Sequence, residues 1–504
     1  MNYFASPWVR RSLAILAAIV AVVAVAAFAG ARYVRSHALA MIHEKYGDAV
    51  QVSDLHVELF PRITIRTGRV IVQDKDRPEP VPLIEIRNIA AETNWISALR
   101  GNVNDVRLEG LKITVPPRRD GSTAEPKPHK DNPPHFRIGR IVADGTVLTV
   151  LPKKAGKDPL QFDIYKLTLH GAGPDQAMTF QAVLKNAKPP GEIQTRGKFG
   201  PWNDEPAGTP VSGTYTFRDA DLGVFKGISG KLSSEGNYQG TLDQIHVEGR
   251  TDTPDFALRV ARHAVHLTTE FRARVDGTDG NTYLDSVNGH FGNTPVETRG
   301  KVEKLPGATG KTVSLDGIVN GGSLRDILWL AVPSNDPPMN GAISFRSKIV
   351  IPPGDIDVIE KLQLDGVFAI GHARFSKLDV QEKVNELSHR GQGEPEAPPT
   401  DTVASNFRGR FKLANGTMTF TNLNFDVPGV AVALDGTYGM LDRKLDMRGT
   451  ARLNAKLSQT TTGFKSVLLK AIDGFFSHKS AGAVLPIKVS GTSDSPSFGL
   501  SLRG

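Results

Sequence analysis

Two stretches of the sequence carry residue types that could bind a ligand. The tripeptide Gly-Lys-Thr at 310–312 resembles the end of a phosphate-binding loop, but Leu305 stands where that loop needs its first glycine. The residues that follow, Val313 and Leu315, alternate like a strand, whereas a phosphate loop leads into a helix. A hairpin turn is therefore the favoured interpretation.

The second stretch is Asp-Gly-Thr-Asp-Gly-Asn at 276–281, which offers oxygen ligands but not with the spacing of a calcium loop. A turn is favoured here too. The sequence has no H-E-x-x-H or G-x-S-x-G motif, and its 13 histidines are scattered. Lone histidines such as His170 and His246 are expected on the water-facing side of strands. The pattern predicts a protein that is not an enzyme, with no metal site and no cofactor.

Composition excludes further classes. The 504 residues contain no cysteine, which rules out disulfides, thiol nucleophiles and cysteine-based metal sites. The net charge of +8 is spread thinly, and basic residues do not cluster with aromatic ones, so nucleic-acid binding is not favoured. The 50 glycines and 33 prolines suit a turn-rich β protein.

Period-two alternation of apolar and polar residues is the strongest structural signal. It runs from residue 407 to residue 453, with Leu413 and Met418 on either side of an Asn-Gly pair at 415–416. Asn-Gly between two alternating runs predicts a β-hairpin, because both turn residues need positive φ. The same alternation fills most of the chain and predicts an antiparallel meander with one apolar face.

Helices are expected to be few, at 95–100, 324–331, 380–389 and 462–476. Ser323 is expected to cap the second of these, with Asp326 as its capping-box partner and Pro333 after its end. The last has apolar residues at helical spacing: Phe464, Val467, Leu468, Ala471, Ile472 and Phe475. It is interpreted as a lid packed on the end of the sheet or, alternatively, as a membrane-touching element.

Residues 12–31 carry no charge and are flanked by arginines. Twenty helical residues reach roughly 30 Å, enough to span a bilayer. Ala-Phe-Ala at 27–29 could be a signal-peptide cleavage site, but signal-peptide cores run only about 7–15 residues, so an uncleaved anchor is favoured. The short tail at 1–11 is expected in the cytoplasm.

The remaining divisions follow composition. An N-terminal β region is expected at 32–116, a Pro- and charge-rich loop at 117–134, a central β region at 135–390, a flexible loop at 391–403 and a C-terminal β region at 404–504. Many strands share a residue pair followed by glycine, as in Thr195-Arg196-Gly197 and Leu364-Asp365-Gly366. These glycines mark either bends that curve the sheet or ordinary turns.

A sheet this long cannot leave its apolar face in water. It could pack as a sandwich, close into a barrel, or curl into a trough whose inner face holds apolar ligands. Periodicity alone does not separate these three.

The chain resembles the AsmA family of diderm bacteria over almost its whole length. The matching pieces are the N-terminal apolar segment, 55–61, 90–101, 106–115, 136–145, Gly-Lys-Phe-Gly-Pro-Trp at 197–202, 320–333, 362–375, 380–391, Leu-Ala-Asn-Gly at 413–416, Leu-Asp-Gly-Thr-Tyr at 434–438, and 457–459 running on to Gly-Thr at 491–492. None is a catalytic signature. The resemblance implies a single-pass inner-membrane protein, mostly periplasmic, similar to bridge-like lipid transfer proteins.

It also implies an elongated, curved antiparallel β groove with a few short covering helices. Phospholipid acyl chains would lie in that groove, supporting lipid transport to the outer membrane and envelope integrity. Candidate groove residues are Leu167, Leu169, Phe180, Leu184, Phe411, Leu413, Met418, Phe420, Val432 and Leu434. Expected partners are phospholipids, the inner membrane, and outer-membrane assembly or lipid-transport proteins. The alternative is a non-transporting scaffold that assists outer-membrane protein assembly through an open sheet edge.

Overall fold

The computed structural model describes residues 50–59, 62–73, 82–115, 137–151, 159–173, 176–201, 208–308, 310–376, 378–394, 403–455, 477–478 and 481–500. Within them the chain is mainly β with few helices, as the alternation predicts. The predicted membrane anchor at 12–31, the loop at 117–134 and the helix at 462–476 lie outside the described residues.

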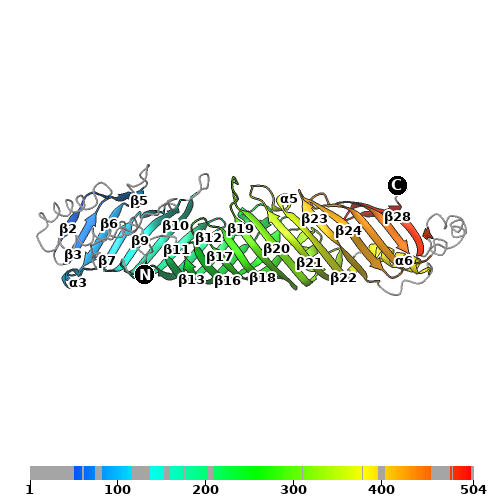
Figure 1. Ribbon diagram of the computed structural model, residues 1–504, viewed down its shortest axis with the longest axis horizontal. Helices are drawn as coiled ribbons and strands as arrows, with labels where there is room; N and C mark the ends of the chain where they lie inside the picture. Colours follow the sequence, from blue (N-terminus) through cyan, green and yellow to red (C-terminus); the bar gives the residue numbers. More distant parts are fainter. Residues whose placement is uncertain are drawn as a thin grey trace, which may run out of the picture. The chain divides into compact units, whose positions relative to one another are not determined.

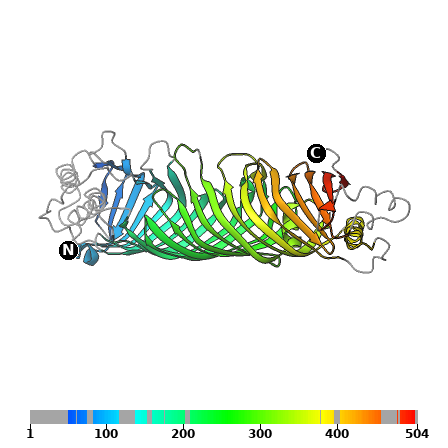
Figure 2. The same ribbon diagram turned by 45° about the vertical axis from the view of Figure 1, so that its right-hand side comes forward.

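The chain divides into two compact units. Unit 1 holds residues 1–220, 233–251 and 272–283, and unit 2 holds residues 221–232, 252–271 and 284–504. In each unit the described strands form a strongly curved sheet (Figures 1 and 2). The predicted curved sheet is therefore confirmed at the level of each unit.

Unit 1 opens with short elements: β1 (Val50–Val52), β2 (His56–Glu58), β3 (Ile63–Thr67), β4 (Val70–Gln73), β5 (Pro82–Ile86), β6 (Asn88–Thr93), α3 (Trp95–Leu99), β7 (Asn102–Glu109) and β8 (Lys112–Val115). Longer strands follow: β9 (Arg137–Val150), β10 (Leu160–Ala172), β11 (Met178–Ala187) and β12 (Pro190–Phe199). The next strands contribute residues to both units: β13 (Pro210–Asp221), β15 (Lys231–Thr241), β16 (Gln244–Leu258), β17 (Ala264–Val275) and β18 (Thr282–Phe291).

The beginning of unit 1 is forked. One branch pairs β2, β3, β6 and β7, the other pairs β1, β4, β5 and β8, and both end on β9. Strands β7 and β8 run parallel to β9, side by side with its first and second halves. The two branches share one buried cluster that includes Ile63, Val70 and Ile138. This end of the unit is thus filled by its own side chains.

Parallel pairing corrects the prediction of a purely antiparallel sheet. Parallel strands need a crossover of about a dozen residues or more. Residues 116–136 separate β8 from β9 in the sequence, and the Pro- and charge-rich composition of that stretch predicted only a loop. From β9 to β13 every pairing is antiparallel.

Unit 2 begins with η3 (Leu222–Val224) and β14 (Ile228–Ser229). Its meander contains β19 (Thr294–Glu303), β20 (Thr312–Ser323), α4 (Leu324–Ala331), β21 (Met339–Ile351), α5 (Val358–Lys361), β22 (Gln363–Phe375), α6 (Leu378–Gln392), β23 (Ser405–Ala414), β24 (Thr417–Val427), β25 (Val430–Gly439), β26 (Lys444–Leu453), β27 (Ser477–His478), β28 (Ala481–Thr492) and β29 (Pro496–Leu500). The ladders from β19 to β29 are antiparallel.

Local chemistry explains the meander's turns and helices. Asn415 and Gly416 have φ of 50° and 68°, so the predicted Asn-Gly hairpin is confirmed between β23 and β24. Helix α4 starts as predicted after Ser323, whose Oγ accepts a hydrogen bond from the Asp326 amide at 3.3 Å. The Asp326 carboxylate does not complete a capping box: it accepts from the Asn293 amide at 2.7 Å and so joins α4 to the turn before β19.

Candidate apolar binding face

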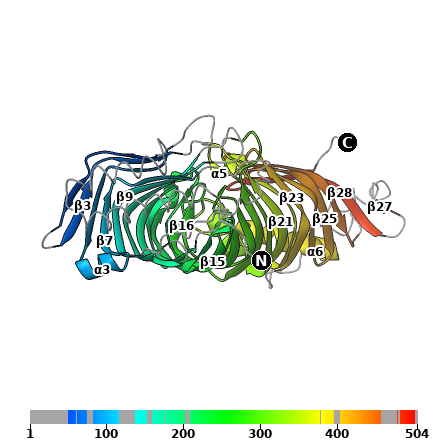
Figure 3. The same cartoon turned by 60° about the vertical axis from the view of Figure 1, so that its left-hand side comes forward.

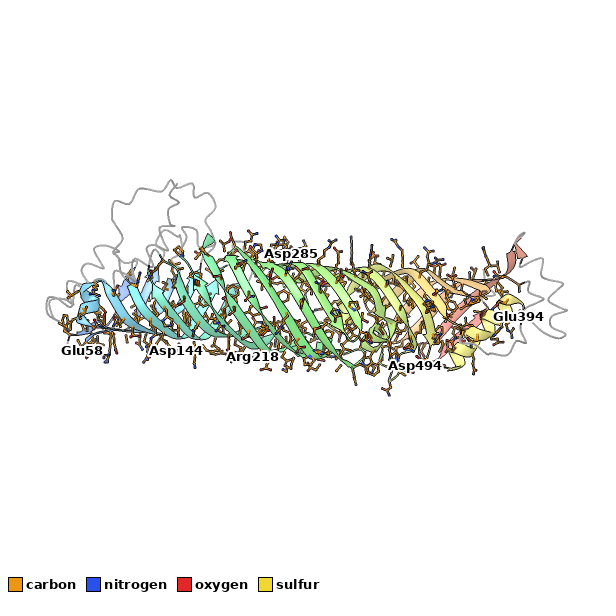
Figure 4. The ribbon with its side chains drawn as sticks, turned by 90° about the horizontal axis from the view of Figure 1, so that it is seen from below. Glu58, Asp144, Arg218, Asp285, Glu394 and Asp494 are labelled. Carbon is orange, nitrogen blue, oxygen red and sulfur yellow. The ribbon has the colours of Figure 1, made fainter. Side chains whose placement is uncertain are left out.

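Each unit's sheet has two chemically different faces, and β22 illustrates them. Asp365 and Val367 point to one side and are exposed, while Leu364 and Phe368 point to the other and are half-buried. We call the apolar side the inner face. It carries Leu169 and Phe180 in unit 1 and Phe411 and Phe420 in unit 2. Side chains project from both sides of the strands in Figure 4.

Strand register sorts the inner-face residues of unit 1 into rows that cross the strands. Directly opposed residues share a face, so successive pairs give rows running from β10 to β13. The rows are Ile164, Leu184, Ile193 and Phe217; Leu167, Ala182, Thr195 and Tyr215; and Leu169, Phe180, Gly197 and Gly213. Most of these side chains are half-buried, so they are shielded by their neighbours without being enclosed.

Unit 2 has longer rows of the same kind. One runs from β20 to β26 through Leu315, Ile349, Leu364, Leu413, Met418, Tyr438 and Leu445. A second runs beside it through Gly317, Ser347, Gly366, Phe411, Phe420, Gly436 and Met447. Both rows carry apolar, small or hydroxyl-bearing side chains and no charge. They form a strip of low polarity that crosses successive strands.

Helices cover one margin of the inner face in unit 2. Leu324 of α4 is buried with Ile343 and Ile370, and Val384 of α6 is buried with Val432 and Val427. Ile343, Ile370 and Val432 belong to a third row, and the helices cover these residues from solvent. In the rows led by Leu315 and Gly317, most side chains stay half-buried.

Helix α6 is held on the sheet by polar as well as apolar contacts. Gln381 Oε1 accepts from the Phe375 amide at 2.9 Å, and its Nε2 donates to the Val403 carbonyl at 3.0 Å. Asn385 Oδ1 accepts from the Val403 amide at 3.1 Å, and Ser388 Oγ donates to the Pro428 carbonyl at 2.8 Å. The predicted helix at 380–389 is confirmed, but it is longer and extends into the predicted loop at 391–403.

All ten candidate groove residues lie on the inner face, but in different settings. Leu167, Leu169, Phe180 and Leu184 of unit 1 and Phe411, Met418 and Phe420 of unit 2 are half-buried. Leu413, Val432 and Leu434 are 1%, 4% and 9% exposed, which leaves them little surface for a ligand. The candidate groove-end helix residues Phe464, Val467, Leu468, Ala471, Ile472 and Phe475 lie outside the described residues.

Glycines of the recurring signature lie inside strands and on the inner face, which favours the bend interpretation over turns. A methyl group at Gly197 or Gly366 would overlap a carbonyl oxygen of the adjacent strand, Ser212 or Arg346. At Gly366 it would also lie 2.9 Å from Cζ of Phe411, whose ring lies over the glycine. Glycine thus permits close strand approach, and the aromatic ring replaces the missing side chain.

Tyrosines play the same part in unit 1 and add hydroxyl groups to the inner face. A hydrogen bond of 2.7 Å joins Tyr238 Oη to Thr195 Oγ1, and one of 3.0 Å joins Tyr215 Oη to Ser234 Oγ. Burial raises the pKa of both phenols above 10.0. Sequence periodicity does not show that these hydroxyls pair.

The outer face carries charges that alternate in sign across neighbouring strands of unit 2. Register places Arg299, Asp316, Lys348, Asp365 and Lys412 in one row. The Nε of Arg299 is 3.9 Å from Oδ2 of Asp316, and both side chains are largely exposed. Each pair contributes little to stability, but opposite charges favour this register over a shifted one.

The two ligand-like motifs are turns, as predicted. Gly310 and Lys311 lie between the antiparallel strands β19 and β20, and Thr312 is the first residue of β20. Asp276 accepts hydrogen bonds from the Thr278 amide at 2.8 Å and sits in the turn between β17 and β18. In the described ranges, no group of three or more histidine, aspartate or glutamate side chains is placed to hold a metal ion.

The helices that the structure describes are all too short or too polar to be a transmembrane span. Comparison with known proteins adds no assignment: the chain matches no protein-family model, no curated protein and no solved structure.

Proposed function

We propose that the inner faces of the two units bind the acyl chains of phospholipids. The observation that carries this proposal is the set of uncharged rows, such as Leu315–Ile349–Leu364, whose side chains stay half-buried on a curved sheet. Half-buried apolar side chains leave hydrophobic surface that a further apolar molecule can cover. Each methylene group removed from water gains about 0.8 kcal/mol, so a lipid tail lying along several strands gains enough to be held.

The proposed mechanism needs no catalytic residue. Acyl chains would lie across successive strands, and the polar headgroups would remain in water. Hydrophobic contact is non-directional, so a tail shifted by one strand spacing of about 4.8 Å meets a similar surface. Such a surface holds a lipid and also lets it slide, which suits conduction as well as storage.

The setting that we propose rests on the sequence. Residues 12–31 would anchor the protein in the inner membrane, and the β units would lie in the periplasm. The resemblance to the AsmA family supports a role in lipid transport to the outer membrane and in envelope integrity. Phospholipid would move from the membrane where it is supplied to the membrane where it is needed.

Native mass spectrometry of the detergent-purified full chain tests the proposal. We expect phospholipid to co-purify and to exchange with labelled lipid added in vesicles. The expected variant pair is Leu364→Asp, on the inner face, and Val367→Asp, on the outer face of the same strand, where the side chain is 44% exposed. Loss of lipid in the first variant alone supports the proposal; lipid-free wild-type protein that extracts no lipid would overturn it.

A further inference from the structure

Helix α3 exposes large apolar side chains although it has only five residues. Ile96 and Leu99 are each 66% exposed, and Trp95 is 39% exposed. Ala98 is the buried residue of the helix. Other exposed apolar residues, such as Tyr165 and Leu441, belong to different elements, as is normal for a protein surface. Three large exposed apolar side chains on one short helix make α3 a candidate interaction site.

The local structure of α3 does not depend on these three side chains. Asn94 caps the helix, with its Oδ1 accepting a hydrogen bond from the Ser97 amide at 2.7 Å. The Arg100 and Gly101 amides close the other end on carbonyls of Ser97 and Ala98. The chain therefore builds a defined turn of helix whose large apolar side chains point to solvent. Figures 1 and 3 show α3 at the ends of β6 and β7, on the margin of unit 1.

Arginines surround α3 along this margin. Arg100 follows the helix directly, Arg137 hydrogen-bonds through its amide to the Gly101 carbonyl, and Arg62 precedes Ile63, the partner of Thr93. All three arginines are exposed. On the adjoining strands, Glu92 of β6 is exposed, and Asp105 of β7 forms an ion pair with Arg140 at 2.7 Å. The margin therefore combines apolar residues with an excess of positive charge.

We propose that α3 docks unit 1 on the surface of a bilayer that contains anionic lipid. Tryptophan and leucine would enter the interface between headgroups and acyl chains, and the arginines would meet lipid phosphates. The inference rests on the proposed function for the presence of a membrane. Residues 32–49 separate the proposed anchor from β1 and can span at most about 65 Å, so the start of unit 1 stays within that distance of the bilayer that holds the anchor.

Single-site fluorescence tests the docking, and the absence of natural cysteine makes labelling specific. A polarity-sensitive dye is attached to Leu99→Cys in the full chain, which is reconstituted in nanodiscs of phosphatidylglycerol and phosphatidylethanolamine. We expect quenching by a lipid-borne quencher at residue 99. The matched label is Tyr165→Cys, also exposed in unit 1 but on β10, where we expect no such quenching.

The arginines give the test a second, graded readout. Replacing Arg62 or Arg100 with glutamine is expected to lower the ratio of docked to undocked label about fivefold per residue.

Equal quenching at residues 99 and 165 overturns the proposal. So does a residue-99 label that is shielded from aqueous iodide but not quenched by lipid, because a protein would then cover α3. Co-purified lipid is also measured on the double variant Ile96→Ser and Leu99→Ser. The amount of lipid should equal that of the wild type, so this measurement distinguishes a failure of docking from a failure of acyl-chain binding.

Discussion

The ring of Phe411 on β23 lies over Gly366 of β22, its directly opposed partner. This pair shows how the sheet is built to curve: the glycine removes a side chain where neighbouring backbones approach, and the ring restores the lost apolar cover. Tyr215 over Gly236 and Tyr238 over Gly213 repeat the arrangement in unit 1. The inner face is therefore shaped by glycine positions as much as by its apolar residues.

Gly366→Ala is expected to destabilise unit 2. The added methyl group would overlap the Arg346 carbonyl and press on Phe411, at a cost of about 1–3 kcal/mol typical of overpacking. Gly371→Ala on the same strand is the control, since its methyl group would meet only Asn406 Oδ1, at 3.9 Å. Chemical denaturation of both variants measures the difference. Equal midpoints would show that close approach at Gly366 is not a constraint.

Unit 1 is expected to lose stability at alkaline pH through its buried tyrosines. Burial raises the pKa of Tyr238 above the unfolded value of 10.0, so folded protein retains a proton that unfolded protein gives up. The stabilising contribution is complete below pH 10.0 and is lost as the pH rises through the folded pKa. Spectroscopic titration of tyrosinate in the folded protein should show phenols that ionise late.

The Tyr238→Phe variant tests separately the stability that the hydrogen bond contributes and the ionisation of the Tyr238 phenol. The variant should lose about 0.5–1.5 kcal/mol at neutral pH with the bond to Thr195, and one late-ionising phenol should disappear. Tyr165→Phe, at an exposed position on β10, should leave the stability at neutral pH unchanged. A Tyr238→Phe titration identical to that of the wild type would contradict the assignment.

Asn385→Ala is expected to loosen α6. The change removes the acceptor for the Val403 amide and for Gln381 Nε2 in a buried setting, at a cost of about 1–3 kcal/mol. Glu386→Ala on the exposed side of the helix removes an ion pair with Arg390 worth about 0.3–0.5 kcal/mol. Hydrogen exchange of α6 should accelerate strongly in the first variant only. Similar exchange in both would mean that apolar packing alone holds the helix.

Much of this architecture follows from local sequence. Alternation predicted the strands of the meander, Asn415-Gly416 predicted a hairpin, and Ser323 predicted the start of α4. Each of these signals acts over a few residues. The parallel ladders on β9 could not be foreseen, since they join strands across residues 116–136 with no local signature. The polar contacts of α6 with Val403 and Pro428 were hidden for the same reason.

The candidate site was predicted only in outline. Period two places Leu413 and Phe420 on one face, but it cannot show that Leu413 is 1% exposed while Phe420 is half-buried. That difference arises from curvature and from neighbours in other strands. It matters for experiment: substitution at Leu413 tests packing, whereas substitution at Leu364 tests the accessible surface. The short helix predicted at 95–100 is confirmed as α3, but a single turn of helix has no period that shows which of its side chains stay exposed.

Charge on the inner face is expected to abolish acyl-chain binding. A carboxylate at Ile349 or Leu364 would have to be desolvated beneath a lipid tail, which costs far more than the contact gains. Ile349→Asp should therefore lose co-purified phospholipid, whereas Lys348→Asp, on the outer face of the same strand, should retain it. Lipid retained equally by both variants, with both folded by circular dichroism, would argue against an inner-face site.

The most direct measurement is photo-crosslinking in cells from a single unnatural side chain at Leu364, compared with one at Val367. The two positions share β22 but lie on opposite faces. Mass spectrometry should identify phospholipid attached at residue 364 and none at residue 367. Crosslinks from residue 364 solely to the protein's own side chains, or lipid captured equally at both positions, would contradict acyl-chain binding on the inner face.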